Sequence, residues 1–228
     1  MKQCFEGFPA EANRYLRRLQ ENNDRAWFEA NRDQYDRYIL DPARLWVQCM
    51  AERLREVAPH LVADPRVDRS IFRVHRDTRF SKDKRPYKTY LGVFMWEGQR
   101  PKMECPGFYF QLEADAVTLG AGINQIPAEL LPRYRDAVVS HEQELREILN
   151  ELNRNEMGVT GESYKRVPAG YPADHPLAEL LKKKSLFAHY KVPTPPELHT
   201  PDFIDWCYAR FYALAPLHRW LVNTLEEA

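Results

Sequence analysis

Long apolar segments are missing from this chain of 228 residues. No run approaches the ~20 apolar residues that a membrane-spanning helix needs. The N-terminal residues 1–8 lack the apolar stretch of a signal peptide, so we expect no export. These absences favour a cytoplasmic protein that does not enter a membrane.

Cysteine is scarce as well, with four residues that lie far apart and form no C-x-x-C pair. Cys49 and Cys207 stand among apolar neighbours, which is typical of reduced core cysteines rather than of bridges or ligands. The seven histidines show no metal-ligand spacing, and the chain contains no P-loop, G-x-G-x-x-G, H-E-x-x-H or G-x-S-x-G motif. We therefore expect no metal and no cofactor, and the sequence leaves open whether the protein is an enzyme.

The chain also lacks net charge, because 33 Lys and Arg residues balance 33 Asp and Glu residues. Zero net charge argues against a protein that coats nucleic acid over its whole surface. It is compatible with a local site for an anion. The apolar fraction of 44 % is ordinary for a soluble domain and allows a core of normal size.

Apolar residues with helical spacing predict helices near both ends of the chain. Candidate N-caps are Asp24, Asp41 before Pro42, Ser140 in a capping box with Gln143, and the Asp174-His-Pro176 run. Pro216 is expected to kink or split the last helix. The predicted helices cover residues 9–20, 25–39, 42–57, 127–138, 141–152, 177–184 and 201–225.

Alternating or continuous apolar patterns predict a sheet between these helices. The strands are expected at residues 69–75, 89–96, 108–113, 117–123 and 185–192, with a turn or hairpin at 156–170. Short links predict an antiparallel β-meander that packs on the N- and C-terminal helices, so residues 1–228 form a single α+β domain. The opposite side of the sheet is either simply solvated or the floor of a ligand site, and it would show Arg73, His75, Tyr109, Gln111, Thr118 and two glycines.

The most unusual stretch connects the first two predicted strands. Residues 69–88 contain eight basic and two acidic residues, a net charge of +6, so the rest of the chain has a net charge of −6. The connection at 76–88 is longer than most loops of compact domains, and such loops are often functional. Its alternating charges and its Pro86-Tyr87 pair indicate a shaped loop rather than a disordered tail.

This combination of side chains suits phosphate. Arginine offers a rigid fork of donors, lysine offers a point charge, and Thr78 and Ser81 add hydroxyl groups. We therefore predict a basic anion (phosphate) site on the 70–90 strand-loop-strand for a phosphorylated small molecule or a nucleotide. Asp77 and Asp83 would orient the cations or, in an enzyme, act on a proton. The predicted ligand-binding residues are Arg73, Arg76, Arg79, Ser81, Lys82, Lys84, Tyr87 and Lys88.

Other interpretations remain open. The arginines could serve only internal ion pairs in a structural or interaction protein, with acids such as Glu97, Glu104, Glu113 or Asp115. The loop could instead follow a nucleic-acid backbone while bases stack on Tyr87, Tyr90 or Tyr109. His75 is a candidate general base, although a histidine on a strand is more often a packed or solvated residue. The sequence determines neither the ligand nor the oligomeric state.

Several short motifs occur together in a recognisable order. They are Phe5-Glu-Gly-Phe8, Asn22-Asn23, Trp27-Phe28, Asn31-Arg32, Phe72-Arg-Val-His-Arg-Asp-Thr-Arg-Phe-Ser-Lys-Asp-Lys84, Pro86-Tyr-Lys88, Pro106-Gly-Phe-Tyr109, Gly120-Ala-Gly122, Tyr164-Lys-Arg166, Asp174-His-Pro176 and Leu180-Leu-Lys-Lys-Lys-Ser185. The series resembles the bacterial and fungal family called domain of unknown function 2461, over almost the whole chain.

The resemblance implies one domain whose hallmark is the central basic stretch, and it implies no reaction. In the family pattern a small hydroxyl residue is usual where Arg85 stands, and the His75 position is not restricted to histidine, which weakens a role for either. A second motif, Lys165-Arg166 with Asp174-His175, could fold back toward the first. It is otherwise explained by a proline-rich turn followed by a helix cap.

Overall fold

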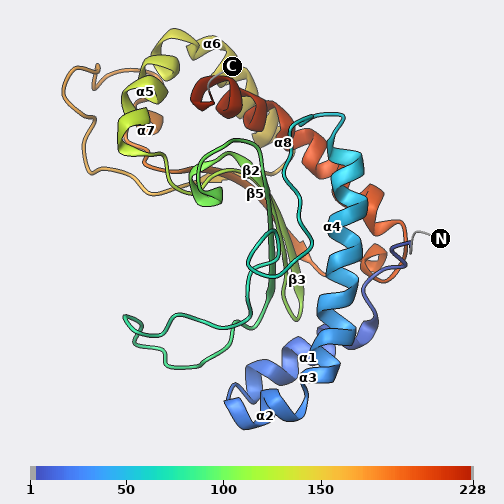
Figure 1. Cartoon of the computed structure of the whole chain (residues 1–228). Helices are drawn as coiled ribbons and strands as arrows, with labels where there is room; N and C mark the ends of the chain where they lie inside the picture. The colour runs from blue at the N-terminus through green and yellow to red at the C-terminus, as the bar shows by residue number, and fades with distance from the viewer. Residues whose placement is uncertain (1–3, 227–228) are drawn as a thin grey trace.

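A five-stranded antiparallel sheet forms the centre of the protein (Figure 1), whose computed structural model describes residues 4–226. Its order is β1-β2-β3-β5-β4, so the first three strands form a meander and β5 adds to the edge of β3. The strands are β1 (Leu91–Trp96), β2 (Gly107–Leu112), β3 (Ala116–Ile123), β4 (Gly158–Thr160) and β5 (Leu186–Pro193). The predicted α+β fold with a meander is confirmed. The first three residues of the N-terminal segment, on which the prediction of no signal peptide partly rests, lie outside the described residues.

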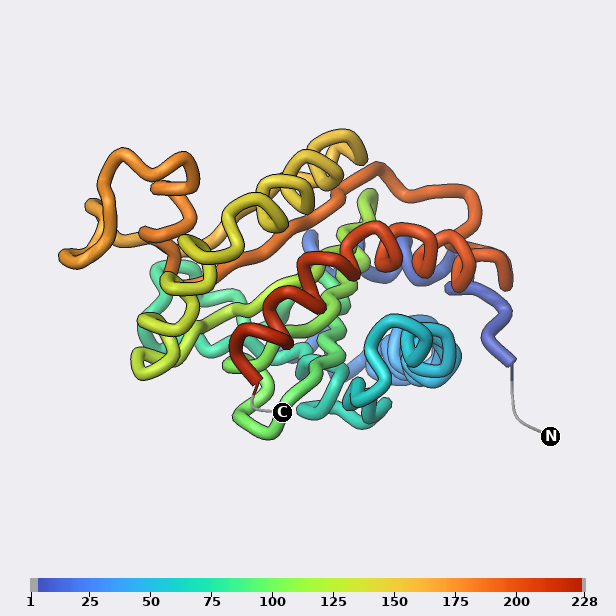
Figure 2. Tube along the Cα trace, turned by 90° about the horizontal axis from the view of Figure 1, so that it is seen from above, coloured from blue at the N-terminus to red at the C-terminus, as the bar shows by residue number. Residues whose placement is uncertain are grey.

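Helices cover one face of this sheet, and Figure 2 shows α8 lying across α4 on that side. The longer helices are α1 (Ala10–Glu21), α4 (Asp41–Leu54), α5 (Leu131–Ser140), α6 (Glu142–Arg154) and α8 (Phe203–Leu225). The shorter ones are α2 (Arg25–Ala30), α3 (Arg32–Tyr35), α7 (Ala178–Leu181), the π-helical turn η1 (Asp36–Leu40), and the 3-10 turns η2 (Lys102–Glu104), η3 (Ala128–Leu130) and η4 (Pro196–His199).

The core lies between the sheet and these helices. Phe108 and Phe110 alternate with Tyr109 along β2, as the period of two predicts, and both phenylalanines are fully buried. Trp46 of α4 stacks on Phe110 with ring centroids 4.4 Å apart, while Phe211 of α8 meets Phe108 edge to face at 5.3 Å. The burial of these large rings joins the two ends of the chain to the same face of the sheet.

The other face stays open between two projecting loops. In Figure 1 the 76–88 loop leaves the sheet at the lower left, and the 161–177 loop leaves it at the upper left. Both loops therefore lie on the side opposite α4, at the two ends of the uncovered face.

The predicted strand at residues 69–75 does not form. Ile71 bridges Val93 of β1, whereas His75 bridges Tyr87 on the far side of the loop. The chain changes partner within four positions. It therefore makes one isolated bridge to β1 and one across the loop instead of a continuous ladder. The prediction failed here because Ile71 and Val74 have a high β-propensity, whereas the pairing partner of the chain changes between these two positions.

The predicted helix at residues 25–39 is also interrupted. Asn31 leaves the helical conformation between α2 and α3, and its side-chain amide donates to the Trp27 carbonyl. The chain then passes through η1 directly into α4, so Asp41 is already helical and caps nothing. Pro42 has no N–H for the preceding turn, which accounts for the wider π-helical turn before it.

Two further cap predictions and one predicted helix break need correction. Ser140 ends α5, where its hydroxyl donates to the Asp136 carbonyl, and Gln143 bonds Glu147, so there is no capping box. His175 rather than Asp174 accepts from the Leu177 amide before α7. Pro216 lies inside α8 and does not split it.

The segment at residues 156–170, predicted as a turn or hairpin, does not pair with itself but with β5. Its β4 pairs with β5, with Gly158 opposite His189, and the intervening chain forms the 161–177 loop and α7. The strand is too short for its pattern to be distinguished from a turn in the sequence.

Candidate functional site

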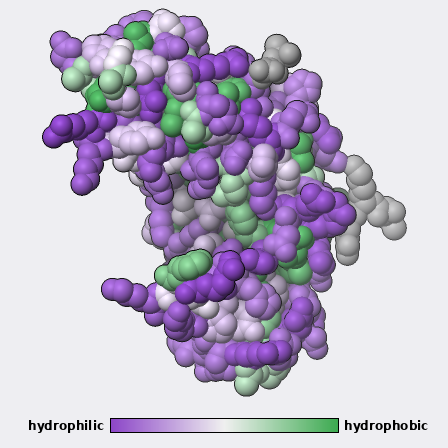
Figure 3. All heavy atoms as spheres, turned by 60° about the vertical axis from the view of Figure 1, so that its left-hand side comes forward, coloured by the Kyte–Doolittle hydropathy of each residue, from purple (hydrophilic) through white to green (hydrophobic). Residues whose placement is uncertain are grey.

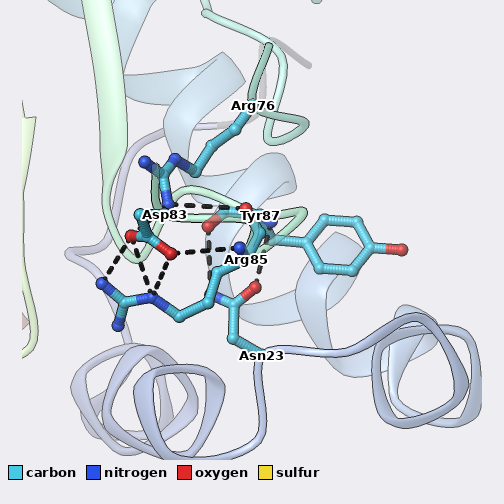
Figure 4. A network of polar contacts seen from close by, with 5 residues as sticks. All are labelled: Asn23, Arg76, Asp83, Arg85 and Tyr87. Atoms are coloured by element: carbon cyan, nitrogen blue, oxygen red, sulfur yellow. Dashed lines mark hydrogen bonds and ion pairs between the residues drawn. The ribbon is translucent and has the colours of Figure 1, made fainter. Parts of the chain in front are cut away.

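Two aspartates organise the basic loop from inside, as Figure 4 shows for one of them. Asp77 accepts from Nε and Nη2 of Arg79, and Asp83 accepts in the same way from Arg85, with Nη2 contacts of 2.7 and 2.8 Å. Arg76 reaches across the loop to Asp83 at 2.6 Å. The loop therefore holds much of its own charge in ion pairs between neighbouring residues.

These contacts lower the pKa of both carboxyl groups. Hydrogen bonds from Arg79 bring the pKa of Asp77 to about 2. Hydrogen bonds from Arg85, and then from Arg76, hold the pKa of Asp83 well below its ordinary value. Both side chains are therefore fixed anions that orient guanidinium groups, and each is a weak base near neutral pH.

The distant acids named as alternative partners lie elsewhere. Glu97 pairs with His218, Glu113 with Lys191, and Asp115 with Arg17. Among the described residues, the arginines of the 76–88 loop form ion pairs only with Asp77 and Asp83.

Asn23 fastens the far end of the loop to the turn between α1 and α2. Its amide accepts from the Tyr87 N–H and donates to the Tyr87 carbonyl, both at 3.0 Å, as a neighbouring strand would (Figure 4). The Tyr87 ring stacks on Phe28 at 4.1 Å and is only 2 % exposed, so it belongs to the core. His75 lies 5.1 Å from the same ring and is exposed at the surface.

Four of the predicted ligand-binding residues remain open to solvent or to a ligand. Arg73 and Lys82 are exposed and have no ion-pair partner among residues 4–226. Lys84 donates to the Thr78 carbonyl, and the Ser81 amide closes a turn on the same carbonyl. These contacts shape the tip of the loop and leave the charges of the two lysines available.

Lys88 has the most distinctive environment of the predicted cations. It is half-buried, and its ammonium lies 5.2 Å from the centre of the Phe72 ring. The ammonium of Lys102, from η2, lies 4.4 Å from that ring and donates to the Arg69 carbonyl at 2.6 Å. Burial lowers the pKa of Lys88, the positive charges of Arg73 and Lys102 lower it further, and the negative charge of Asp68 opposes this shift without reversing it. An anion placed here would relieve that repulsion.

Lys88 also lies between two neighbouring clefts. One cleft of about 360 Å³ is lined by the inner side of the basic loop, including Arg76, Asp83 and Arg85. The other, of about 510 Å³, follows the open face of the sheet. Lys88 and Tyr90 line both, so the cationic loop continues into the groove on the sheet.

The groove has an aromatic lining. Tyr109 of β2 and Phe187 of β5 meet edge to face at 6.1 Å, and further lining residues include Phe72, Tyr90, Phe94, Thr118, Asn124 and His189. Figure 3 shows the surface hollowed on this side between an upper and a lower projection. The arrangement offers flat apolar surfaces beside a cluster of positive charge.

The sequence analysis found part of this groove. It placed Tyr109 and Thr118 on the open side of the sheet, as observed, whereas Arg73 and His75 do not line the groove. It missed Lys102, which lies against the ring of the lining residue Phe72, and it missed two lining residues, Phe187 and His189. Alternation along residues 186–189 could have identified the last two, because Leu186 and Ala188 are buried against the helices.

Residues 4–226 contain no cluster of three His, Cys, Asp or Glu side chains that could hold a metal ion. Within the same part of the chain, no helix is long and apolar enough to cross a bilayer.

The fold and the site define a class: an α+β protein whose antiparallel sheet is covered by helices on one face and hollowed into an aromatic, cation-edged groove on the other. Residues 11–220 match the model of the family described as conserved hypothetical protein (DUF2461), so the chain belongs to that family. A comparison with curated proteins found no match.

Proposed function

We propose that this protein binds a phosphorylated small molecule of the nucleotide class across the groove and the adjoining basic loop. The observation that carries the proposal is the position of Lys88, a half-buried lysine beside Arg73 and Lys102 at the junction of the two clefts. The negative charge of Asp68 acts on Lys88 and Lys102 and that of Asp77 on Arg73, but none of the three cations forms an ion pair among residues 4–226. A phosphate group would supply the direct partner that they lack.

The aromatic lining supports a planar group beside that phosphate. The rings of Tyr90, Tyr109 and Phe187 provide surfaces on which a nucleobase stacks. The groove volume of about 510 Å³ falls in the range of roughly 300–1,000 Å³ that is usual for small-molecule sites. In this proposal the sheet binds the base and Lys88 binds the phosphate, while Arg73 and Lys102 add positive charge beside Lys88.

The paired arginines take a supporting role. Arg76 lines the first cleft while Asp83 fixes its guanidinium, and Arg79 is fixed by Asp77 in the same way. Because these pairs fix each guanidinium, the loop is organised before a ligand arrives. Some N–H donors of each guanidinium remain free to bind the ligand. Lys82 and Lys84 at its tip add positive potential.

A nucleic-acid strand is the second candidate ligand, and one observation favours it. Phe80 at the tip of the loop is 95 % exposed, and the Arg79 guanidinium lies 5.8 Å from its ring. An exposed aromatic ring among cations is typical of surfaces that stack bases of single strands. Such binding would weaken steeply with salt, with a logarithmic slope near −0.7 for each neutralised phosphate.

Thermal unfolding at low salt tests these alternatives with a panel of nucleotides, sugar phosphates, inorganic anions and short oligonucleotides. A ligand at a hundredfold excess over its Kd stabilises the native state by about 2.7 kcal/mol, which gives a readily measured rise in Tm. We expect a selective rise with one class of nucleotide, and Lys88→Met should reduce that affinity by about 10- to 100-fold, because a hydrogen bond to a charged group contributes about 1.5–3 kcal/mol.

The matched control is Lys182→Met, because Lys182 pairs with Glu179 and lines neither cleft. Equal effects of the two substitutions would contradict the proposed site. A rise with oligonucleotides alone would favour the second candidate, and no rise with any ligand would favour a structural role for the ion pairs.

A further inference from the structure

A second cationic cavity lies in the other projecting loop, around Arg135 of α5. This arginine is only 7 % exposed, and no carboxylate among the described residues pairs with it. Its Nε donates to the Leu181 carbonyl at 3.0 Å, whereas its Nη2 is buried and has no hydrogen-bond partner in the described part of the chain. Burial of a guanidinium with an unsatisfied N–H donor costs free energy, so we expect the partner of this donor to be a molecule outside the chain.

Two tyrosines hold this guanidinium in place. The rings of Tyr164 and Tyr171 lie 5.6 and 5.9 Å from the Arg135 guanidinium carbon, as in cation–π contacts. The Tyr171 hydroxyl donates to Asp136 at 2.9 Å, so the nearest carboxylate on α5 is already engaged. Arg135 is therefore fixed in direction while its charge remains unpaired.

More positive charge surrounds the opening of the same cavity. The cavity, of about 550 Å³, is lined by Arg135, Tyr164, Lys165, Arg166, Val167 and Pro168. Lys165 and Arg166 are exposed and make no ion pair among residues 4–226. Lys184, whose ammonium also lies 5.6 Å from the Tyr164 ring, already pairs with Glu162 at 3.1 Å. Three cations thus converge on one opening without an acid that faces them.

We infer that this cavity is a second anion site, which takes a phosphate group through the Arg135 fork and the charges of Lys165 and Arg166. A multiply charged phosphate suits three cations better than a single carboxylate does, and a planar guanidinium binds two of its oxygens at once. The site explains the Tyr164-Lys-Arg166 motif, which the groove does not use. The 161–177 loop and the basic loop lie at opposite ends of the open face (Figure 1), and the two sites share no lining residue.

The test weakens the first site and measures phosphate binding at the second. In a Lys88→Met background, inorganic phosphate and a sugar phosphate are titrated while ³¹P line broadening and calorimetric heat are recorded. Lys165→Gln with Arg166→Gln should lower phosphate affinity at least tenfold without loss of folding, because both side chains are exposed. The matched control, Arg146→Gln with Arg154→Gln on α6, removes the same charge from outside the cavity and should change affinity less than twofold.

Arg135→Lys tests the guanidinium itself, since it keeps the charge and removes the fork. We expect at least a tenfold loss of affinity in this variant. Tighter binding of the sugar phosphate than of inorganic phosphate would identify an organic phosphate as the ligand, and equal binding would identify the free anion. The inference is overturned if phosphate does not bind in the Lys88→Met background, if the cavity variant and the control bind equally, or if folded Arg135→Lys keeps full affinity. Should Arg135→Lys fail to fold, the cavity variant against its control decides the outcome.

Discussion

At the scale of single residues, the balance of charge around Lys88 differs from that in the rest of the loop. Arg76, Arg79 and Arg85 share two aspartate partners, so most of their charge is already compensated. Lys88 is half-buried and forms no ion pair among residues 4–226, and the charges of Arg73 and Lys102 lower its pKa more than that of Asp68 raises it. This contrast separates the residues that shape the loop from those that we propose to contact phosphate.

The lowered pKa of Lys88 predicts a pH dependence of ligand binding. Only the ammonium form attracts phosphate, and in the free protein this form is lost at a pH below the ~10.4 of an ordinary lysine. Affinity should therefore be highest below the lowered pKa and should fall as the pH rises through it. Calorimetric titration from pH 7 to pH 10.5 measures this decrease, and the bound state should take up protons on the alkaline side.

Lys88→Met provides the comparison for that titration. Its binding should be weaker and should not show the decrease that belongs to Lys88. If the wild type and the variant had parallel profiles over the whole range, another group would be responsible and Lys88 would not contact the anion.

At the scale of elements, the structure explains which predictions from the sequence succeeded. The strands at β2 and β3 and the buried faces of α1 and α8 follow from local patterns, because the period of burial is set by the element itself. Residues 69–75 failed because their partner changes along the chain from Val93 to Tyr87. No local pattern contains that information.

The same distinction applies to the candidate site. The basic loop was visible because its charges are contiguous in sequence. The groove was not visible as a whole, because Phe187 meets Tyr109 only through the pairing of β2, β3 and β5, which lie far apart in the chain. The pairing of each aspartate with the arginine two residues later depends on the loop conformation, which the sequence does not specify.

The tie between Asn23 and Tyr87 yields a prediction about the stability of the loop. Asn23→Ala removes two hydrogen bonds, each with a net contribution of about 0.5–1.5 kcal/mol, so it should lower the free energy of unfolding by about 1–3 kcal/mol. Asn23→Asp keeps the acceptor for the Tyr87 N–H and loses the donor to its carbonyl, so a smaller loss is expected. Urea unfolding monitored by circular dichroism measures both.

Asn153→Ala is the control for this pair, because Asn153 is an exposed residue of α6. It should change the free energy of unfolding by less than about 0.5 kcal/mol. If Asn23→Ala unfolded at the same urea concentration as the control, the tie would not hold the loop.

At the scale of the whole molecule, the two faces of the sheet differ in what covers them. One face is sealed by α4 and α8, with Trp46 and Phe211 packed against β2. The other keeps half-exposed aromatic side chains between the basic loop and the 161–177 loop. The helices pack on the sealed face and support the sheet on which the groove lies, while the basic loop places positive charge at the edge of the groove.

The central claim is that one continuous site binds an aromatic base and a phosphate together. Calorimetry of a nucleoside monophosphate, its nucleoside and ribose 5-phosphate tests it directly. Linking two groups that bind adjacent subsites raises affinity above that of either part. We predict that the intact nucleotide binds at least about tenfold more tightly than either part, and that Lys88→Met weakens the nucleotide but not the nucleoside. Equal affinities for the three ligands, or an equal loss for nucleoside and nucleotide in Lys88→Met, would contradict the account.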